Sequence, residues 1–318
     1  MDWLLYLVAL GFVKSLQSLP LRWVVHLGRA GGGLAYWLDA RHRRVALENL
    51  TACFQNEKSP REIHGLAREN FQRLGENYCA ALKTASMSWE KLRPHLTVRG
   101  ADRIRPQQGP SGAQNRVLAV GHFGNFELYA RAGNLAPGFR FATTYRGLRQ
   151  PSLNRLLQSL REQSGCLFFE RRTEATALKK ALGEGNLLVG FLADQHAGKG
   201  GLWLPFFGRE CSTNVAPAVV ALRYRCPLYT AICYRTGVAQ WEIEVGQEIP
   251  TEAEGRPRSV AEISIDINRA LEAAVRRDPA NWFWVHKRWK PRPSVTGTPQ
   301  PKNTPLASPE PDRASRPA

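Results

Sequence analysis

Acidic residues and lysine are scarce in this chain of 318 residues. Asp and Glu number 27 against 44 Lys and Arg, and 34 of the 44 are arginine, so the net charge is +17. This excess indicates anionic partners: nucleic acid, phospholipid headgroups, phosphorylated metabolites or an acidic protein. The planar guanidinium suits phosphate and carboxylate, but a GC-rich genome produces the same arginine bias without a function. Composition alone leaves both interpretations open.

Cysteine is also sparse and is not arranged for metal binding. The six cysteines include no C-x-x-C pair and have no histidine at zinc-finger spacing, so we expect neither a metal site nor a disulfide framework. No small-residue cleavage site follows the apolar start, which argues against a cleaved secretory signal. Reduced thiols facing the cytosol fit these observations best. The six residues are Cys53, Cys79, Cys166, Cys211, Cys226 and Cys233.

The N-terminus lacks a hydrophobic run long enough to span a bilayer. Residues 3–13 form an unbroken apolar run of eleven residues, whereas a spanning helix needs about 20. A second apolar patch at residues 19–25 leads into a glycine-rich stretch that ends at Leu38. Tryptophans and arginines alternate with aliphatic residues here, as in segments that lie in a membrane interface. We predict a membrane-associated helical segment over residues 1–40; a pair of core helices and a tilted, interrupted span are the alternatives.

The middle of the chain alternates between helical and strand-like patterns. Ser59, Pro60 and Glu62 supply a cap, an N1 proline and an N3 acid to a periodic segment that reaches Trp89. The alternation predicts an α/β sheet protein over residues 41–290. The predicted helices are 126–135, 151–163 and 174–182, the predicted strands are 117–120, 166–169, 186–193, 228–233 and 241–245, and residues 99–115 are a connector.

The last 28 residues differ in composition from the rest. Eight of them are proline, and most of the others are small, polar or charged. Such a segment cannot bury enough apolar surface to fold. Residues 291–318 are therefore predicted to be a disordered Pro-rich tail.

Several common catalytic motifs are missing. The chain contains no G-x-G-x-x-G, G-x-x-x-x-G-K-[ST], G-x-S-x-G or H-E-x-x-H. The glycine-rich stretch at residues 28–33 follows no convincing strand. Nucleotide hydrolysis and dinucleotide redox chemistry therefore have little support.

One segment does carry the residues of acid–base chemistry. Residues 120–127 read V-G-H-F-G-N-F-E, where a predicted strand ends and a helix begins. Open α/β sheets place their sites at such strand ends. If His122 lies in the glycine-flanked turn, the chain can fold back so that Glu127 reaches the imidazole. The histidine is then fixed in one tautomer and can take a proton from a hydroxyl, and free amides of the helix start can stabilise an oxyanion.

Further segments make this pattern specific. They are R-R-V-A-L-E-N-L (residues 43–50), Y-R (145–146) before P-S-L-N (151–154), F-L-A-D-Q-H-A-G-K-G-G (191–201), L-P-F-F-G-R (204–209) and W-V-H-K-R-W-K (284–290).

With these segments the chain, from about Leu21 to Lys290, resembles the lipid A biosynthesis lauroyl/myristoyl acyltransferases of the lysophospholipid acyltransferase superfamily. The resemblance implies a glycerophosphate-acyltransferase-like mixed sheet flanked by helices. It implies an enzyme at the cytoplasmic face of the inner membrane that moves an acyl chain from acyl carrier protein to a hydroxyl of a lipid A precursor. In the family's H-x4-D/E motif the histidine is the general base and the acid its partner, here His122 and Glu127. Neither a cofactor nor an acyl-enzyme is implied, and acyl-CoA is an alternative donor.

The remaining candidates are assigned to substrate binding. Arg146 matches the family's Tyr-Arg position and is a candidate for binding phosphate or an oxyanion, the alternative being a solvated loop arginine. Asp194 and Gln195 end a predicted strand at the same edge and are expected to shape the site. The full set of predicted substrate-binding residues is Asn125, Arg146, Arg149, Arg161, Asp194 and Gln195.

Three other interpretations are kept. The chain could be an acyltransferase of the same superfamily acting on another glycolipid, phospholipid or aminolipid. It could be a basic membrane- or nucleic-acid-binding protein without activity; however, its nine tryptophans are not interleaved with basic residues in a single-strand-binding stripe and no nucleic-acid motif is present, so no nucleic-acid partner is expected. Cys166 could act as a covalent nucleophile, although a buried strand thiol is the simpler interpretation.

Overall fold

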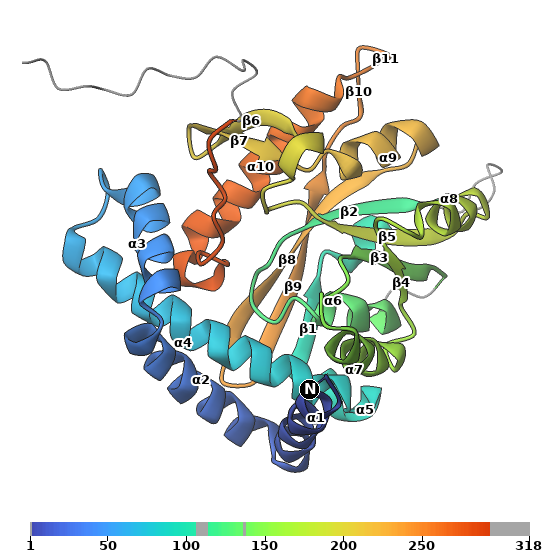
Figure 1. Cartoon of the computed structure of the whole chain (residues 1–318). Helices are drawn as coiled ribbons and strands as arrows, with labels where there is room; N and C mark the ends of the chain where they lie inside the picture. The colour runs from blue at the N-terminus through green and yellow to red at the C-terminus, as the bar shows by residue number, and fades with distance from the viewer. Residues whose placement is uncertain (1, 106–113, 136–137, 293–318) are drawn as a thin grey trace, which may run out of the picture.

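The fold is a seven-stranded mixed sheet with helices on both faces (Figure 1). The computed structural model describes residues 2–105, 114–135 and 138–292. The strand order is β1-β9-β8-β2-β5-β3-β4, and only the β8–β9 pair is antiparallel. This confirms the predicted α/β class. The sheet strands are β1 (Leu96–Arg99), β2 (Arg116–Val120), β3 (Arg140–Tyr145), β4 (Leu167–Glu170), β5 (Leu187–Leu192), β8 (Leu228–Gly237) and β9 (Gln240–Glu248).

Alternate residues of the central strands face two different layers. Val117 and Ala119 of β2 join a core cluster with residues of α9 (Ala216–Tyr224) and α10 (Val260–Arg277). Leu118 and Val120 face the other side, toward the short helix α6 (Leu128–Arg131). The period-two alternation of a strand thus separates the core from the layer that holds the pocket described below.

The helices that precede the sheet pack against each other (Figure 1). Helix α4 begins with the predicted capping box of Ser59 and Glu62. It packs along α2 because both helices present glycines at the contact: a Cβ on Gly28 would lie 2.5 Å from the carbonyl oxygen of Gly75. The glycine-rich stretch therefore serves helix packing. These helices are α1 (Asp2–Ser18), α2 (Leu21–Leu38), α3 (Ala40–Phe54) and α4 (Pro60–Ala85).

Large apolar side chains remain exposed on α1 and α2. On α1 they recur at Leu4, Val8 and Phe12, and on α2 at Trp23, Leu27, Leu34 and Leu38, spacings that place each set along one helix face. In the part of the chain that the structure describes, no helix has the length and hydropathy to cross a membrane.

The remaining elements of the described residues include the two helices predicted at residues 151–163 and 174–182. The remaining elements are α5 (Trp89–Leu92), α7 (Pro151–Glu162), α8 (Ala175–Gly183), the hairpin β6 (Leu202–Phe206) and β7 (Arg209–Thr213), the hairpin β10 (Glu252–Ala253) and β11 (Arg256–Pro257), and the 3-10 turns η1 (Arg93–His95), η2 (Ala101–Ile104), η3 (Ala132–Leu135), η4 (Gly198–Gly200) and η5 (Pro279–Asn281).

One predicted helix differs from the structure. The helix predicted at residues 126–135 is shorter: α6 begins at Leu128 and continues as the 3-10 turn η3. The predicted division at residue 40 stays a prediction, although α1 contacts α7 and α2 packs on α4. Most of the predicted Pro-rich tail, residues 293–318, lies outside the described residues.

Candidate active site

His122 and Asp194 follow the ends of two neighbouring strands. Strands β2 and β5 are parallel, and Val120 pairs with Leu192 in their register. The backbone N–H of Ala193 extends this pairing by donating to the Val120 carbonyl oxygen at 2.8 Å. His122 and Asp194 therefore face each other although 72 residues separate them. The turn that carries His122 is completed by Gly124, whose φ of 51° favours glycine.

The Asp194 carboxylate holds the imidazole of His122 in place. Its Oδ1 lies 2.8 Å from Nδ1 of His122, and its Oδ2 accepts the His122 backbone N–H at 2.7 Å. The carboxylate side chain is fully buried. Burial opposes its ionisation, but the nearby His122 and the hydrogen bonds outweigh burial and lower the pKa of Asp194. An ionised Asp194 directs the Nδ1 proton of His122 toward itself and leaves Nε2 as the proton acceptor.

Aromatic rings and one amide surround the imidazole. The centroids of Phe126 and Phe283 lie 4.9 Å and 5.7 Å from that of the His122 ring. Nε2 of Gln195 lies 3.4 Å from Nε2 of His122. The His122 side chain keeps 14% of its surface exposed. Its Nε2 edge therefore faces a polar amide within an otherwise apolar frame.

Glu127 pairs with Arg161 in the structure, whereas the sequence predicted a contact with His122. Oε1 of Glu127 accepts from Nη2 of Arg161 at 2.6 Å, and Oε2 accepts from Nε at 3.1 Å. The reason is that Glu127 precedes α6 and turns toward α7, where Arg161 lies, whereas Asp194 is in register with the histidine turn. Asp194, predicted only to shape the site, is the residue that orients His122.

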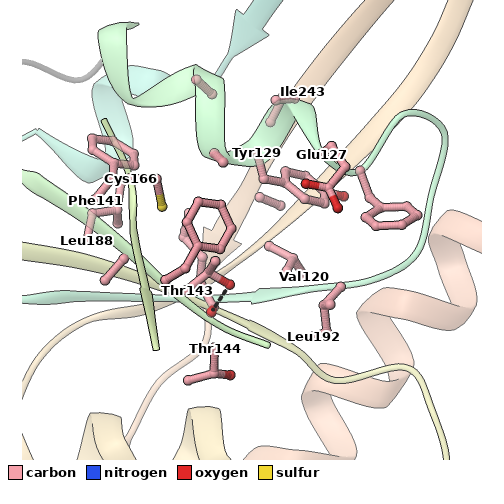
Figure 2. A pocket seen from close by; sticks show the side chains of 18 of the residues that line it. Val120, Glu127, Tyr129, Phe141, Thr143, Thr144, Cys166, Leu188, Leu192 and Ile243 are labelled. Atoms are coloured by element: carbon pink, nitrogen blue, oxygen red, sulfur yellow. Dashed lines mark hydrogen bonds between the residues drawn. The ribbon is translucent and has the colours of Figure 1, made fainter. Parts of the chain in front are cut away.

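An apolar pocket begins beside this pair and continues along one face of the sheet (Figure 2). Val120, Leu192 and Phe126, which adjoin the His122 turn, belong to its wall, and Ile104 and Val245 line it farther along. In this view Glu127 and Cys166 lie on opposite sides of the space. The guanidinium of Arg161 lies 5.0 Å from the centroid of Phe168, so the Glu127–Arg161 pair forms a polar part of an apolar wall.

Arg146, Arg149 and Asn125 were also predicted to bind substrate. Arg146 and Arg149 are exposed in the loop after β3, whose last residue, Tyr145, lines the pocket. Asn125 is 1% exposed, and its Nδ2 donates a hydrogen bond to Oγ1 of Thr84 in α4 at 3.4 Å. Asn125 thus joins the His122 turn to α4. Substrate contact by these three residues stays a prediction.

Cys166 lies in the pocket wall without the features of a nucleophile. Burial, and then the nearby Glu127, raise the pKa of its thiol to about 12. A thiolate, not a thiol, is the attacking species. Within the described residues, no three or more His, Cys, Asp and Glu side chains come together as a metal site.

Two contributors to the site had little signal in the sequence. Trp282 donates its indole N–H to Oδ2 of Asp194 at 2.8 Å, and Phe283 packs on His122. Both directly precede the W-V-H-K-R-W-K segment, 160 and 161 residues after the histidine. The available signal was the concentration of aromatic residues there, which sequence alone does not connect to His122.

Comparison with known proteins gives the family. The sequence model for bacterial lipid A biosynthesis acyltransferases matches residues 1–291. The lipid A biosynthesis palmitoleoyltransferase of Escherichia coli (strain K12) is 27% identical over 304 residues, which cover 89% of this chain and 90% of that protein. The lipid A biosynthesis lauroyltransferase of the same organism is 26% identical over 305 residues, 92% of each chain. These matches confirm the resemblance found from the motifs. The chain belongs to the bacterial lipid A biosynthesis acyltransferase family.

Proposed function

We propose that this protein transfers a fatty acyl chain from acyl carrier protein to a hydroxyl group of a lipid A precursor, at the cytoplasmic face of the inner membrane. The observation that carries the proposal is the position of the His122–Asp194 pair beside an apolar pocket. The pair can activate a hydroxyl, and the pocket can take a hydrocarbon chain. Membership of the family supplies the substrate class.

The proposed reaction is a direct transfer. Nε2 of neutral His122 accepts the proton of the acceptor hydroxyl while the oxygen attacks the thioester carbon. Asp194 stabilises the imidazolium through Nδ1. The carbon–sulfur bond then breaks, and the proton passes from Nε2 to the departing thiolate. The amide Nε2 of Gln195 lies 3.4 Å from Nε2 of His122. It is placed to donate a hydrogen bond to an oxygen atom that binds beside His122 Nε2.

The apolar pocket is proposed to hold the donor's acyl chain, and Gly190 offers a test of this. Gly190 of β5 lines the pocket, and a Cβ there would meet only Ala142 O at 3.9 Å and Thr143 Oγ1 at 4.0 Å, ordinary contact distances. We expect Gly190→Leu to fold and to shift the preferred donor to a shorter chain, because the new side chain fills part of the pocket. Competition among saturated donors, read by mass spectrometry of the products, measures the shift. Gly183→Leu, on α8 with no atom near its Cβ position, is the control; an unchanged preference in Gly190→Leu would place the chain elsewhere.

The exposed apolar faces of α1 and α2 are proposed to seat the enzyme on the membrane. Trp3, Trp23 and Trp37 expose 72%, 65% and 63% of their surfaces, respectively. Amphipathic aromatic and aliphatic faces of this kind insert into the headgroup region. We expect Trp23→Glu with Leu27→Glu to reduce sedimentation with anionic vesicles severalfold while the melting temperature stays unchanged. The control Val219→Glu changes an exposed valine on α9. Equal losses of vesicle binding in both proteins would contradict specific membrane binding through these helix faces.

The charged loops near the pocket suit an anionic substrate. The backbone N–H of Arg171 is donated to Tyr145 O at 3.0 Å, so the turn after β4 lies beside the loop that carries Arg146 and Arg149. These arginines are exposed. We propose that they bind phosphate groups of the acceptor or acidic side chains of the carrier protein. Rates of the Arg146→Ala variant, measured with the acceptor and the donor varied in turn, show whether the KM for the acceptor or the KM for the donor rises.

The function is tested by mass spectrometry of lipid products. Membranes containing the protein receive acyl carrier protein or CoA thioesters, together with a tetra-acylated, phosphorylated disaccharide and lysophospholipids. A new acyl chain on the disaccharide, supplied by the carrier protein, is the expected result. Acylation of lysophospholipid alone would mean that the acceptor is a phospholipid and not a lipid A precursor. Transfer from CoA thioesters alone would mean that CoA, and not acyl carrier protein, supplies the acyl chain.

A further inference from the structure

The segment around Trp282 is attached to the turn that carries His122. The backbone N–H of Gly124 is donated to Asn281 O at 3.1 Å, and Phe123 and Trp282 form an isolated antiparallel bridge. Phe283, the next residue, packs on the His122 ring. The chain after α10 therefore returns to the catalytic turn and covers it. This segment, residues 281–284, is called the strap below.

Within the strap, the indole of Trp282 is aimed at the Asp194 carboxylate. Its Nε1–H is donated to Oδ2 at 2.8 Å, and the same oxygen accepts the His122 backbone N–H. Two donors on Oδ2 leave Oδ1 directed at Nδ1 of the imidazole. The carboxylate cannot rotate about its carbon–carbon bond without breaking both hydrogen bonds.

Packing prevents the indole itself from turning. Trp282 is 2% exposed, and its ring contacts Trp284 edge-on with centroids 4.6 Å apart and Phe206 with centroids 5.5 Å apart. Nδ2 of Asn70, which is 1% exposed, is donated to the Trp282 carbonyl oxygen at 2.5 Å. The donor is thus held through its backbone and by two neighbouring aromatic rings.

We propose that Trp282 is a positioning residue for acyl transfer, which fixes the rotation of the Asp194 carboxylate and through it the Nε2 edge of His122. This inference rests on the proposed function. It assigns to the strap a role in the reaction beyond closing the fold. Preorganised hydrogen bonds of this kind keep a catalytic base aligned without reorganisation during the reaction.

The charged and titratable surroundings of the pair are shared by the variants proposed below. His286, Arg288 and Tyr129 interact electrostatically with Asp194 from the C-terminal segment and α6. Burial lowers the pKa of His286 to about 4, so it stays neutral near neutral pH. Since none of these groups is changed, a shift in the pH dependence reports the Trp282 contact.

The test compares Trp282→Phe with Trp284→Phe. Both replacements keep an aromatic ring and delete one indole N–H, but Trp284 donates to Pro279 O and not to the carboxylate. For Trp282→Phe we expect kcat to fall about ten- to hundredfold, the effect of losing a hydrogen bond to a charged group, with KM for the acceptor unchanged. The acid limb of the pH profile moves to higher pH, because the pair binds a proton more readily when its anionic state loses a donor. Trp284→Phe lowers the melting temperature and leaves the pH profile in place.

A double-mutant cycle separates positioning from a structural effect. In an Asp194→Asn background, Trp282→Phe should change the residual kcat less than about twofold, because the group it acts through is already altered. Additive losses, or equal kcat and pH profiles in Trp282→Phe and Trp284→Phe, overturn the inference. If Trp282→Phe fails to fold, Asn70→Ala releases the Trp282 carbonyl and is expected to shift the profile in the same direction.

A second readout is independent of turnover. The rate at which diethyl pyrocarbonate modifies His122, followed against pH by peptide mass spectrometry, reports protonation of the imidazole directly. A midpoint displaced to higher pH in Trp282→Phe and unchanged in Trp284→Phe supports the inference; identical midpoints contradict it. A wild-type protein that modifies normally but transfers no acyl chain contradicts the proposed function instead.

Discussion

His122→Ala is expected to lower acyl transfer by at least about 100-fold, because a positioned general base contributes about 10²–10⁴-fold to such reactions. The variant removes the group that accepts the hydroxyl proton and leaves the pocket wall intact, since His122 is absent from that wall. The KM for the donor should therefore change little. Initial rates of product formation, measured by mass spectrometry with saturating donor and acceptor, give the loss.

A matched histidine outside the site provides the control. His42 lies on α3, half exposed, with Nδ1 2.6 Å from Asp39 Oδ2. His42→Ala also removes an imidazole beside a carboxylate, and it should retain nearly full activity. If His122→Ala keeps activity within about tenfold of wild type, the general-base assignment is wrong. Vesicle binding equal to wild type in both variants shows that the loss is one of chemistry.

Asp194→Asn is expected to lower kcat by about 10²–10⁴-fold, with a displaced pH dependence. The lowered pKa of Asp194 means that its carboxylate is ionised where histidine titrates, near pH 6.5 in the absence of perturbation. Removing this charge destabilises the imidazolium, so the acid limb of the rate profile moves to lower pH. The shift is opposite in sign to that expected for Trp282→Phe. The pH profile of kcat/KM for both variants measures it.

Glu127→Gln is the matched comparison, because the sequence motif assigned the orienting role to Glu127. This variant weakens the ion pair with Arg161 and leaves a positive charge unbalanced in the pocket wall. We expect a loss of about tenfold, corresponding to about 1.4 kcal/mol, an unchanged acid limb and a folded protein. If Glu127→Gln instead moves the acid limb while Asp194→Asn leaves it in place, Glu127 is the partner of His122 in the reacting complex.

Local pattern accounts for much of the fold. The capping box at Ser59 and Glu62 places the start of α4, and the apolar run at residues 117–120 becomes a central strand. Both signals depend on neighbours within a few residues, where side-chain and backbone hydrogen bonds act directly. The helix predicted at residues 126–135 was less accurate: α6 begins at Leu128, and the preceding turn is bonded to the strap through Gly124 N–H and Asn281 O.

The site was predicted in part. The sequence placed His122 in a glycine turn at the end of a strand, and the structure has it there. It also placed Asp194 and Gln195 at the same edge of the sheet. The contact between Asp194 and His122 was missed because it depends on which strands are neighbours, and strand order is not a local property.

The sequence by itself determined the α/β class, the family and the position of the candidate base, because hydrophobic periodicity, caps and short motifs are encoded within a few residues. Only the tertiary structure decided which acid orients that base. The adjacency of β2 and β5 brings Asp194 to His122, α7 draws Glu127 away to Arg161, and the strap places Trp282 on the carboxylate. These pairings join residues 34 to 88 positions apart. Their physical cause is the packing of the whole chain, which creates a buried carboxylate that must have its hydrogen bonds satisfied.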